Sequence, residues 1–246
     1  MIKAVICDVD NTLVDFMRIK RIAIEGAAEA MIDAGLNISL EHIIENVYSL
    51  YWKHGMEDQQ VFERFLKKEL GKVDYEILGC AIAEYRRRKA NVTVTYPRVR
   101  KTLIELIRMG LKLAVLSDAP RIPLYTRIAT LKLNKYFNAI VTAEDCKGKH
   151  KPEPEPFLHV CKTLDLKPEE CIMVGDWEER DMVGASNVGM ITAFAAYGDE
   201  WDIKEPRADY ILNDGIYQIV DIVKDINTID DEKEALDVKH DTTENN

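Results

Sequence analysis

Two aspartates, Asp8 and Asp10, directly follow a mostly apolar segment at the start of the chain. That segment, Ile2–Cys7, has the composition of a buried strand. Burying two unpaired carboxylates is costly, so the strand must end at an edge that solvent or a ligand can reach. Two carboxylates this close disfavour each other's ionisation unless a cation lies between them. The pair therefore predicts either general acid–base chemistry, with one carboxyl neutral, or a metal site.

A hydroxyl and a lysine occur at two other places where a predicted element ends or begins. Ser117 and Asp118 directly follow the strand predicted at Leu113–Leu116, and a hydroxyl beside free backbone N–H groups can bind an anion. Lys151 precedes a proline-rich segment that opens a helix. Because proline is rigid and suits the first turn of a helix, this segment should fix the direction of the lysine. Each signal alone is also typical of an ordinary surface loop.

A second pair of acids follows another buried strand, predicted at Cys171–Val174. Asp176 and Asp181 lie five residues apart across a turn that enters a helix. Carboxylates of Asp8 and Asp176, with the backbone carbonyl of Asp10, would suit Mg²⁺, which binds few carboxylates and retains water. Reactive side chains thus stand at the ends of four segments: first acids, then a hydroxyl, then a lysine, then acids again. Ordinary solvated turns do not readily explain this arrangement. Together they predict one site.

Strands that alternate with helices must position these residues. From Arg100 onward, apolar strand segments alternate with helical ones, which indicates right-handed βαβ units and a parallel sheet covered on both faces. From residue 16 to residue 91 the apolar residues recur at helical spacing only. The sequence therefore predicts an α/β fold, a Rossmann-like parallel-sheet core with an inserted α-helical domain. The predicted strands are Ile2–Cys7, Leu113–Leu116, Ala139–Val141, Cys171–Val174, Ile191–Phe194 and Tyr210–Leu212.

The domain boundaries follow from this change of pattern. We assign residues 1–15 and 92–229 to the α/β core, residues 16–91 to the helical insertion, and residues 230–246 to an acidic tail. The tail holds seven acids and two lysines, a net charge of −5, and no aromatic residue. A segment with so few apolar residues cannot bury enough surface to fold, so we expect the tail to be disordered.

Composition argues against several classes of protein. The formal net charge of −10, without a Lys/Arg stripe, disfavours nucleic-acid binding. No apolar stretch approaches the roughly 20 residues that span a bilayer, and the start of the chain lacks the pattern of a signal peptide. The five cysteines are scattered without CxxC spacing, which favours small core residues in a reducing compartment. We therefore expect a cytoplasmic protein without a membrane partner; the sequence leaves its oligomeric state open.

Taken together, the four segments resemble the motifs of the haloacid dehalogenase-like hydrolase superfamily. The resemblance covers the chain up to about Val223. One departure is that Trp177 and Glu178 stand in the fourth motif where small or aliphatic residues are frequent. The matching segments are Asp8-Val9-Asp10-Asn11-Thr12, Ser117, Lys151 within Gly-x-x-Lys-Pro-x-Pro-x-x-Phe, and Gly175-Asp176-x4-Asp181.

The resemblance implies a phosphatase that forms a covalent intermediate. Asp8 would attack phosphorus and become an aspartyl-phosphate. Asp10 would protonate the leaving oxygen and later take a proton from the attacking water. Ser117 and the backbone N–H of Asp118 would hold phosphoryl oxygens, and Lys151 would neutralise charge on those oxygens and on Asp8.

The same resemblance implies a Mg²⁺ cofactor. Asp8, the backbone carbonyl of Asp10 and Asp176 would bind the ion, and Asp181 would orient the site, either as a ligand or through its neighbours. The ion would screen the repulsion between the nucleophile and the phosphate.

The long insertion after the first motif resembles the cap of the subfamily that contains phosphoglycolate phosphatase, β-phosphoglucomutase and the dehalogenases. A cap that closes would exclude water and select the substrate. Tyr51, Trp52, His54 and Arg64 could contact that substrate or simply pack the cap helices. We expect a phosphatase for a small phosphorylated metabolite, such as a sugar, triose or glycolate phosphate. A sugar-phosphate mutase is the alternative that shares all motifs, and a 2-haloacid dehalogenase is disfavoured because the family's dehalogenases lack the second acid, here Asp10.

Overall fold

The computed structural model of the protein describes residues 1–230 and divides them between two compact units. One unit consists of Met1–Asp15 and the chain from Thr95 onward, and the other of Phe16–Val94. The boundary expected after residue 91 falls in the last turn of a helix, so the helical unit continues slightly further than the sequence indicated. Of the expected acidic tail, Asp230 is described: it is helical, like residues 219–229 before it, and pairs with the amino group of Met1. The rest of that tail lies outside the described residues.

The first unit is built on a six-stranded parallel sheet, in which the strand order is β3-β2-β1-β4-β5-β6. All six strands overlap the predicted ones, and the predicted α/β, Rossmann-like fold is confirmed. Most of the strand residues are buried, as the continuous apolar runs of a sheet covered on both faces require. The strands are β1 (Ala4–Cys7), β2 (Lys112–Ser117), β3 (Ala139–Thr142), β4 (Cys171–Gly175), β5 (Ile191–Phe194) and β6 (Tyr210–Ile211).

The strand order creates a switch point beside β1. The chain moves from β1 outward to β3 and then returns to the opposite side of β1 as β4. In the register of the sheet, Cys7 of β1 is level with Val115 of β2 and with Val174 of β4. The residues that follow these three strands therefore emerge side by side at the carboxyl edge of the sheet, where open α/β sheets bind their ligands.

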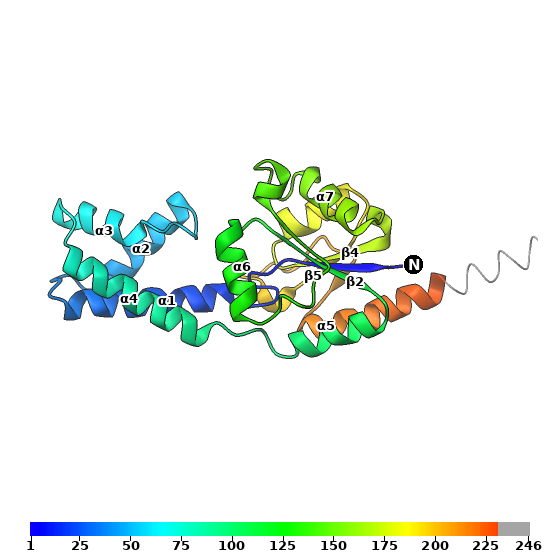
Figure 1. The fold of residues 1–246 in the computed structure, drawn as a ribbon, viewed down its shortest axis with the longest axis horizontal. Helices are drawn as coiled ribbons and strands as arrows, with labels where there is room; N and C mark the ends of the chain where they lie inside the picture. Colours follow the sequence, from blue (N-terminus) through cyan, green and yellow to red (C-terminus); the bar gives the residue numbers. More distant parts are fainter. Residues whose placement is uncertain (231–246) are drawn as a thin grey trace, which may run out of the picture. The chain divides into compact units, whose positions relative to one another are not determined.

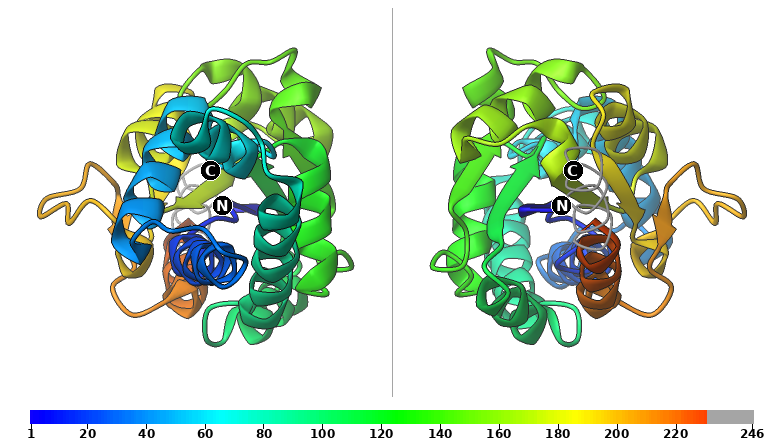
Figure 2. Two further views of the ribbon diagram at one scale, coloured as in Figure 1. Left: turned by 90° about the vertical axis from the view of Figure 1, so that its left-hand side faces the viewer. Right: turned by 90° about the vertical axis from the view of Figure 1, so that its right-hand side faces the viewer.

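Helices cover both faces of this sheet (Figure 1). On one face α7 and α8 pack on side chains such as Ala4, Ile6 and Met173. On the other face lie α5 and the helix over 219–230, which are joined by an ion pair between Glu105 and Lys224 and run near each other (Figure 2). The helices of this unit are α5 (Val99–Arg108), α6 (Arg121–Thr130), α7 (Pro154–Leu164), α8 (Val183–Asn187) and the helix over 219–230.

The second unit contains four helices with an apolar core of their own. Polar N-caps begin two of them: Ser39 accepts a hydrogen bond from His42 N (3.3 Å), and Asp74 from Glu76 N (3.0 Å). The helices are α1 (Phe16–Asp33), α2 (Leu40–His54), α3 (Val61–Leu70) and α4 (Tyr75–Val92). Their shared core includes Ile24, Met31, Ile43, Val47, Phe65 and Leu66.

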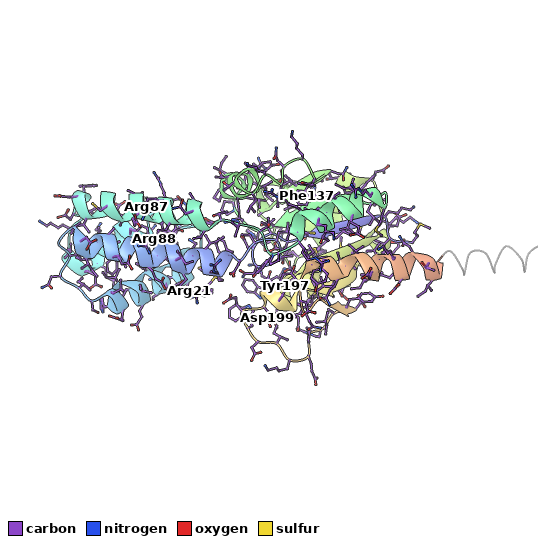
Figure 3. All side chains as sticks on the ribbon, turned by 90° about the horizontal axis from the view of Figure 1, so that it is seen from below. Arg21, Arg87, Arg88, Phe137, Tyr197 and Asp199 are labelled. Carbon is purple, nitrogen blue, oxygen red and sulfur yellow. The ribbon has the colours of Figure 1, made fainter. Side chains whose placement is uncertain are left out.

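The two long helices of this unit, α1 and α4, pack closely against each other. Gly26 of α1 faces Arg88 of α4, and a Cβ at position 26 would lie 2.6 Å from Arg88 Cδ. The guanidinium of Arg88, labelled in Figure 3, binds Glu29 of α1 at 2.5 Å. Of the residues considered for substrate contact, Tyr51 is buried in this core whereas Trp52 is exposed.

No helix within residues 1–230 combines the length and apolar character needed to cross a membrane.

Candidate active site

Three carboxylates meet at the carboxyl edge of the sheet. Asp8 follows β1, Asp176 follows β4, and Asp181 lies in the π-helical turn Glu178–Met182 that leads into α8. One carboxylate oxygen of each lies within 4.8 Å of those of the other two. All three residues are buried, with exposed fractions of 7%, 6% and 1%. The structure thus brings together three of the four acids that the sequence assigned to one site.

Gly175, the last residue of β4, makes this convergence possible. A Cβ at position 175 would lie 2.4 Å from Asp181 Cγ, far inside van der Waals contact. The wide turn after β4 brings Asp181 back over the strand end, where Asp181 Oδ2 accepts a hydrogen bond from the backbone N–H of Trp177 at 3.1 Å. Any larger residue at position 175 would displace this carboxylate, which explains the glycine of the fourth motif.

Lys151 lies between two of the acids. Its Nζ donates to Asp8 Oδ1 at 2.7 Å, to Asp181 Oδ1 at 2.5 Å and to the backbone carbonyl of Leu116 at 3.2 Å. The lysine side chain is 4% exposed. Three acceptors therefore satisfy all three ammonium protons and fix the direction of the Lys151 side chain.

Burial and crowding shift the protonation equilibria of this cluster. Burial, helped by the negative charges of Asp181 and Asp10, raises the pKa of Asp8 to about 7 although Lys151 opposes the shift. Burial and the carboxylates of Asp8 and Asp181 also raise the pKa of Asp176 well above its usual range. Burial works to lower the pKa of Lys151, but the carboxylates of Asp181 and Asp8 outweigh it and raise that pKa.

Three buried carboxylates surround one lysine, so the lysine alone does not balance their negative charge when all three are ionised. A divalent cation among the three carboxylates would do so, and their hard oxygen atoms suit Mg²⁺. The hydroxyl of Thr12 donates to Asp176 Oδ1 at 3.1 Å, which orients that carboxylate. The donor set therefore fits a magnesium ion at Asp8, Asp176 and Asp181. The expected contact through the backbone carbonyl of Asp10 stays a prediction.

The loop after β2 is fixed to the loop that carries Lys151. Ser117 Oγ accepts a hydrogen bond from the backbone N–H of Ala119 at 3.2 Å. Asp118 Oδ1 accepts from the backbone N–H of Lys151 at 3.1 Å. Arg180 adds two contacts, from its Nη2 to Asp118 Oδ2 at 2.8 Å and from its Nε to the Lys151 carbonyl at 3.2 Å. Sequence reasoning overlooked Arg180, because a charged residue in a turn is ordinarily a solvated one.

The side chain of Asp10 is engaged by a second arginine that sequence reasoning overlooked. Arg127 Nη1 lies 2.7 Å from Asp10 Oδ1 and 2.8 Å from Asp10 Oδ2. Arg127 belongs to α6 and is buried. The carboxylate of Asp10 therefore lies apart from the three-carboxylate cluster but close enough to raise the pKa of Asp8.

A distant segment holds the loop after β1. The hydroxyl of Tyr197, labelled in Figure 3, donates to the backbone carbonyl of Thr12 at 2.7 Å. At the next residue, Gly198, a Cβ would lie 1.7 Å from the carbonyl oxygen of Asn11. Asn11 itself has a left-handed backbone conformation with φ 56°. No motif marks Tyr197, so its contact with this loop could be found only from the structure.

Comparison with known proteins agrees with these motifs. The family model of the haloacid dehalogenase-like hydrolases matches residues 2–189. A glyceraldehyde 3-phosphate phosphatase of Methanocaldococcus jannaschii is 34% identical over 92% of this chain and 99% of its own length. One of Methanopyrus kandleri is 31% identical over 85% of this chain and 90% of its own length.

A solved structure shows the same fold. The HAD phosphatase of Thermococcus onnurineus superposes with a TM-score of 0.67 at 24% identity, over 90% of this chain and 98% of its own. The family model and the relatives that match over most of their length indicate the same family. The sheet topology and the motif residues at the edge of the sheet agree with it. The chain therefore belongs to the haloacid dehalogenase-like hydrolases, as its motifs predicted.

Proposed function

We propose that this hydrolase is a Mg²⁺-dependent phosphatase for a small phosphorylated metabolite, and that a triose phosphate, glyceraldehyde 3-phosphate first, is its substrate. The observation that carries the activity is the buried cluster of Asp8, Asp176 and Asp181 with Lys151 bound to Asp8. The function by which the two relatives above are named supports the choice of substrate. The long match to both relatives makes a shared substrate the simplest assignment.

The first half-reaction transfers the phosphoryl group to Asp8. A carboxylate oxygen of Asp8 forms a bond to phosphorus while the bond from phosphorus to the ester oxygen breaks, and Asp10 gives that oxygen a proton. Lys151 neutralises charge on Asp8 and on the phosphoryl oxygens, which the Ser117 hydroxyl and the backbone N–H of Asp118 hold. The products are an alcohol and an aspartyl-phosphate.

The second half-reaction returns the enzyme to its starting state. Water attacks phosphorus, Asp10 takes a proton from that water, and the bond between phosphorus and Asp8 breaks to release inorganic phosphate. Asp8, Asp176 and Asp181 would hold Mg²⁺, which would supply charge screening between the carboxylate and the phosphate. Asp10 therefore serves as an acid in the first half-reaction and as a base in the second.

Phosphate release from a panel of substrates tests this proposal. The panel contains glyceraldehyde 3-phosphate, dihydroxyacetone phosphate, 2-phosphoglycolate, glucose 6-phosphate and p-nitrophenyl phosphate, each with Mg²⁺ and with EDTA. We expect release that requires Mg²⁺ and the highest kcat/KM for a triose phosphate. Absence of release from every ester would contradict the proposed activity, and a preference for another ester would contradict only the substrate.

Two further substrates, glucose 1-phosphate and 2-chloropropionate, separate the two alternative reactions. A mutase would convert glucose 1-phosphate to glucose 6-phosphate with little net release of phosphate. A dehalogenase would release chloride from 2-chloropropionate in EDTA. We expect neither reaction: dehalogenation needs no second acid such as Asp10, and the two relatives are named as phosphatases, which supports transfer to water rather than to a sugar hydroxyl.

A further inference from the structure

Arg127 is a buried charge on the apolar face of a helix. It shares that face of α6 with Leu124 and Ile128, at the spacing that brings residues onto one side of a helix. Its exposed fraction is 5%. Taking a guanidinium out of water costs several kcal/mol, which an ion pair offsets only with good geometry. A buried arginine at this position therefore requires an explanation beyond packing.

The geometry of Arg127 points to Asp10. A single nitrogen, Nη1, lies within 2.8 Å of both carboxylate oxygens of Asp10. The two residues are 117 positions apart in the sequence, so α6 must be docked for the pair to form. The hydrogen bond runs from Nη1 to Oδ2, and the ion pair extends to Oδ1, so both contacts oppose movement of the carboxylate away from Arg127. Each carboxylate oxygen also has a further lone pair with which to share a proton.

Asp10 needs such restraint more than the other acids do. Its side chain is 24% exposed, whereas that of Asp181 is 2% exposed. Both proposed half-reactions require the same carboxylate at a defined distance from the reacting oxygen. A displacement of about 1 Å of a catalytic group can cost roughly a hundredfold in rate. The contact with Arg127 limits such displacement.

We propose that Arg127 is a positioning residue for Asp10: it holds the carboxylate in the orientation that delivers a proton to the leaving oxygen and accepts one from the attacking water. This inference rests on the proposed phosphatase function. The bland alternative is that the ion pair only anchors α6 to the loop after β1. The two roles predict different kinetics. Loss of an anchor lowers the amount of folded enzyme and so lowers every rate in proportion, whereas loss of positioning slows the steps that need Asp10.

The test compares Arg127→Ala and Arg127→Lys with the wild-type enzyme in rapid-mixing assays with p-nitrophenyl phosphate and Mg²⁺. Nitrophenolate leaves without a proton, so formation of the aspartyl-phosphate does not need Asp10, but its hydrolysis does. For Arg127→Ala we expect a burst of one nitrophenolate per enzyme and then a steady-state rate lowered about a hundredfold. The apparent KM should fall together with kcat, because the intermediate accumulates.

Two further measurements complete the test. Mass spectrometry of Arg127→Ala during turnover should show one added phosphoryl group, as it should for Asp10→Asn. Arg127→Lys keeps a cation near Asp10 and should recover part of the steady-state rate. Arg121→Ala removes an exposed arginine of the same helix that pairs with Asp145, and its kinetics should match the wild type.

Each other outcome overturns the inference. A burst that shrinks in proportion to the steady-state rate, with no phosphoenzyme, would mean that Arg127 only supports folding. Unchanged kinetics in Arg127→Ala would mean that Asp10 is held by other contacts. A wild-type enzyme that hydrolyses no phosphate ester would overturn the proposed function and with it the role of Arg127, an outcome that the wild-type assay alone reveals.

Discussion

Buried charge is handled differently in the two units of the molecule. In the α/β unit, Asp8, Lys151 and Asp181 are buried together and bind one another directly. In the helical unit, Lys20 is the one charged residue that is buried among those the structure describes. Its ammonium lies over the ring of Tyr51, 3.7 Å from the centroid, with the ring of Tyr85 at 5.5 Å.

The contrast indicates what each unit is built to do. Acids gathered at a strand edge repel one another, so their arrangement persists only because the sheet register and Lys151 hold it. The charge among aromatic rings meets no such conflict, because ring faces attract a cation. The α/β unit therefore tolerates electrostatic strain at one place, and that place is the candidate site.

The largest effect should come from removing the nucleophile. Asp8→Asn keeps the shape of the side chain but cannot form the aspartyl-phosphate, so phosphate release should fall by several orders of magnitude. Because the variant also removes one of the crowded negative charges, its melting temperature without metal should not fall. Substantial turnover by the folded variant, measured with p-nitrophenyl phosphate, would contradict covalent catalysis.

Replacing the lysine of the acidic cluster should cost both activity and stability. Lys151→Met leaves buried carboxylates uncompensated, a change typically worth about 3 to 5 kcal/mol in the free energy of unfolding. Urea unfolding at pH 8 in EDTA measures this loss. Lys149→Met, which removes an exposed lysine paired with Glu153, is the control. An equal loss of unfolding free energy in the two variants would show that Lys151 does not offset repulsion among the buried carboxylates.

Magnesium should stabilise the protein more at high pH than at low pH. The pKa of Asp8 is raised to about 7, so between pH 4 and 7 the folded state binds more protons than the unfolded state. Stability without metal therefore falls as pH rises through this window. Saturating Mg²⁺ should raise the melting temperature by roughly 5–10 °C at pH 8 and less at pH 5.

Two aspartate variants locate the origin of that shift. Asp176→Asn removes a proposed Mg²⁺ ligand and should abolish most of the rise in melting temperature. Asp221→Asn alters an exposed acid of the helix over 219–230 and should leave that rise intact. An equal rise in melting temperature at pH 5 and pH 8 would show that Mg²⁺ does not act on the carboxylates whose pKa is raised.

The smallest effect should follow substitution of the other buried lysine. Lys20→Met keeps the apolar contacts but loses the attraction between ammonium and rings, worth about 0.5 to 2 kcal/mol. Lys20→Ala also creates a cavity and should cost more, about 2 to 5 kcal/mol. Urea unfolding ranks the two variants against Lys151→Met. If Lys20→Met were as damaging as Lys151→Met, the difference between the units would disappear.

The strands and the family were predictable because their signals are local. Apolar runs such as Cys171–Val174 and the acids directly after them lie within a few residues of one another. The parallel topology then requires distant strand ends to meet. For the same reason Asp8, Lys151 and Asp176 could be placed in one site from the amino-acid sequence alone, although their catalytic roles stay predictions.

Arg127 could not be found in this way, because on α6 a charged residue is buried while large apolar residues are exposed. Ile122 is 75% exposed and Tyr125 is 46% exposed, while Arg127 is buried. A reading by hydrophobicity would place the arginine outside and the isoleucine inside. Arg180 and Tyr197 were missed because their partners lie in distant loops: Tyr197 donates to the backbone carbonyl of Thr12, and Arg180 contacts the backbone carbonyl of Lys151 and the carboxylate of Asp118.

The bonds that Asp118 makes also constrain how this protein can change over generations. Asp118 joins the loop after β2 to the backbone of Lys151 and to Arg180 of the turn after β4. Substitution of Asp118 would remove both contacts, whereas any residue other than proline at position 151 would still supply the backbone N–H, so the constraint on variation is strongest at Asp118 and Arg180. Asp118, Lys151 and Arg180 all belong to the α/β unit. We expect substrate preference, which the resemblance to a cap assigns to the helical unit, to change by variation there while these loops stay as they are.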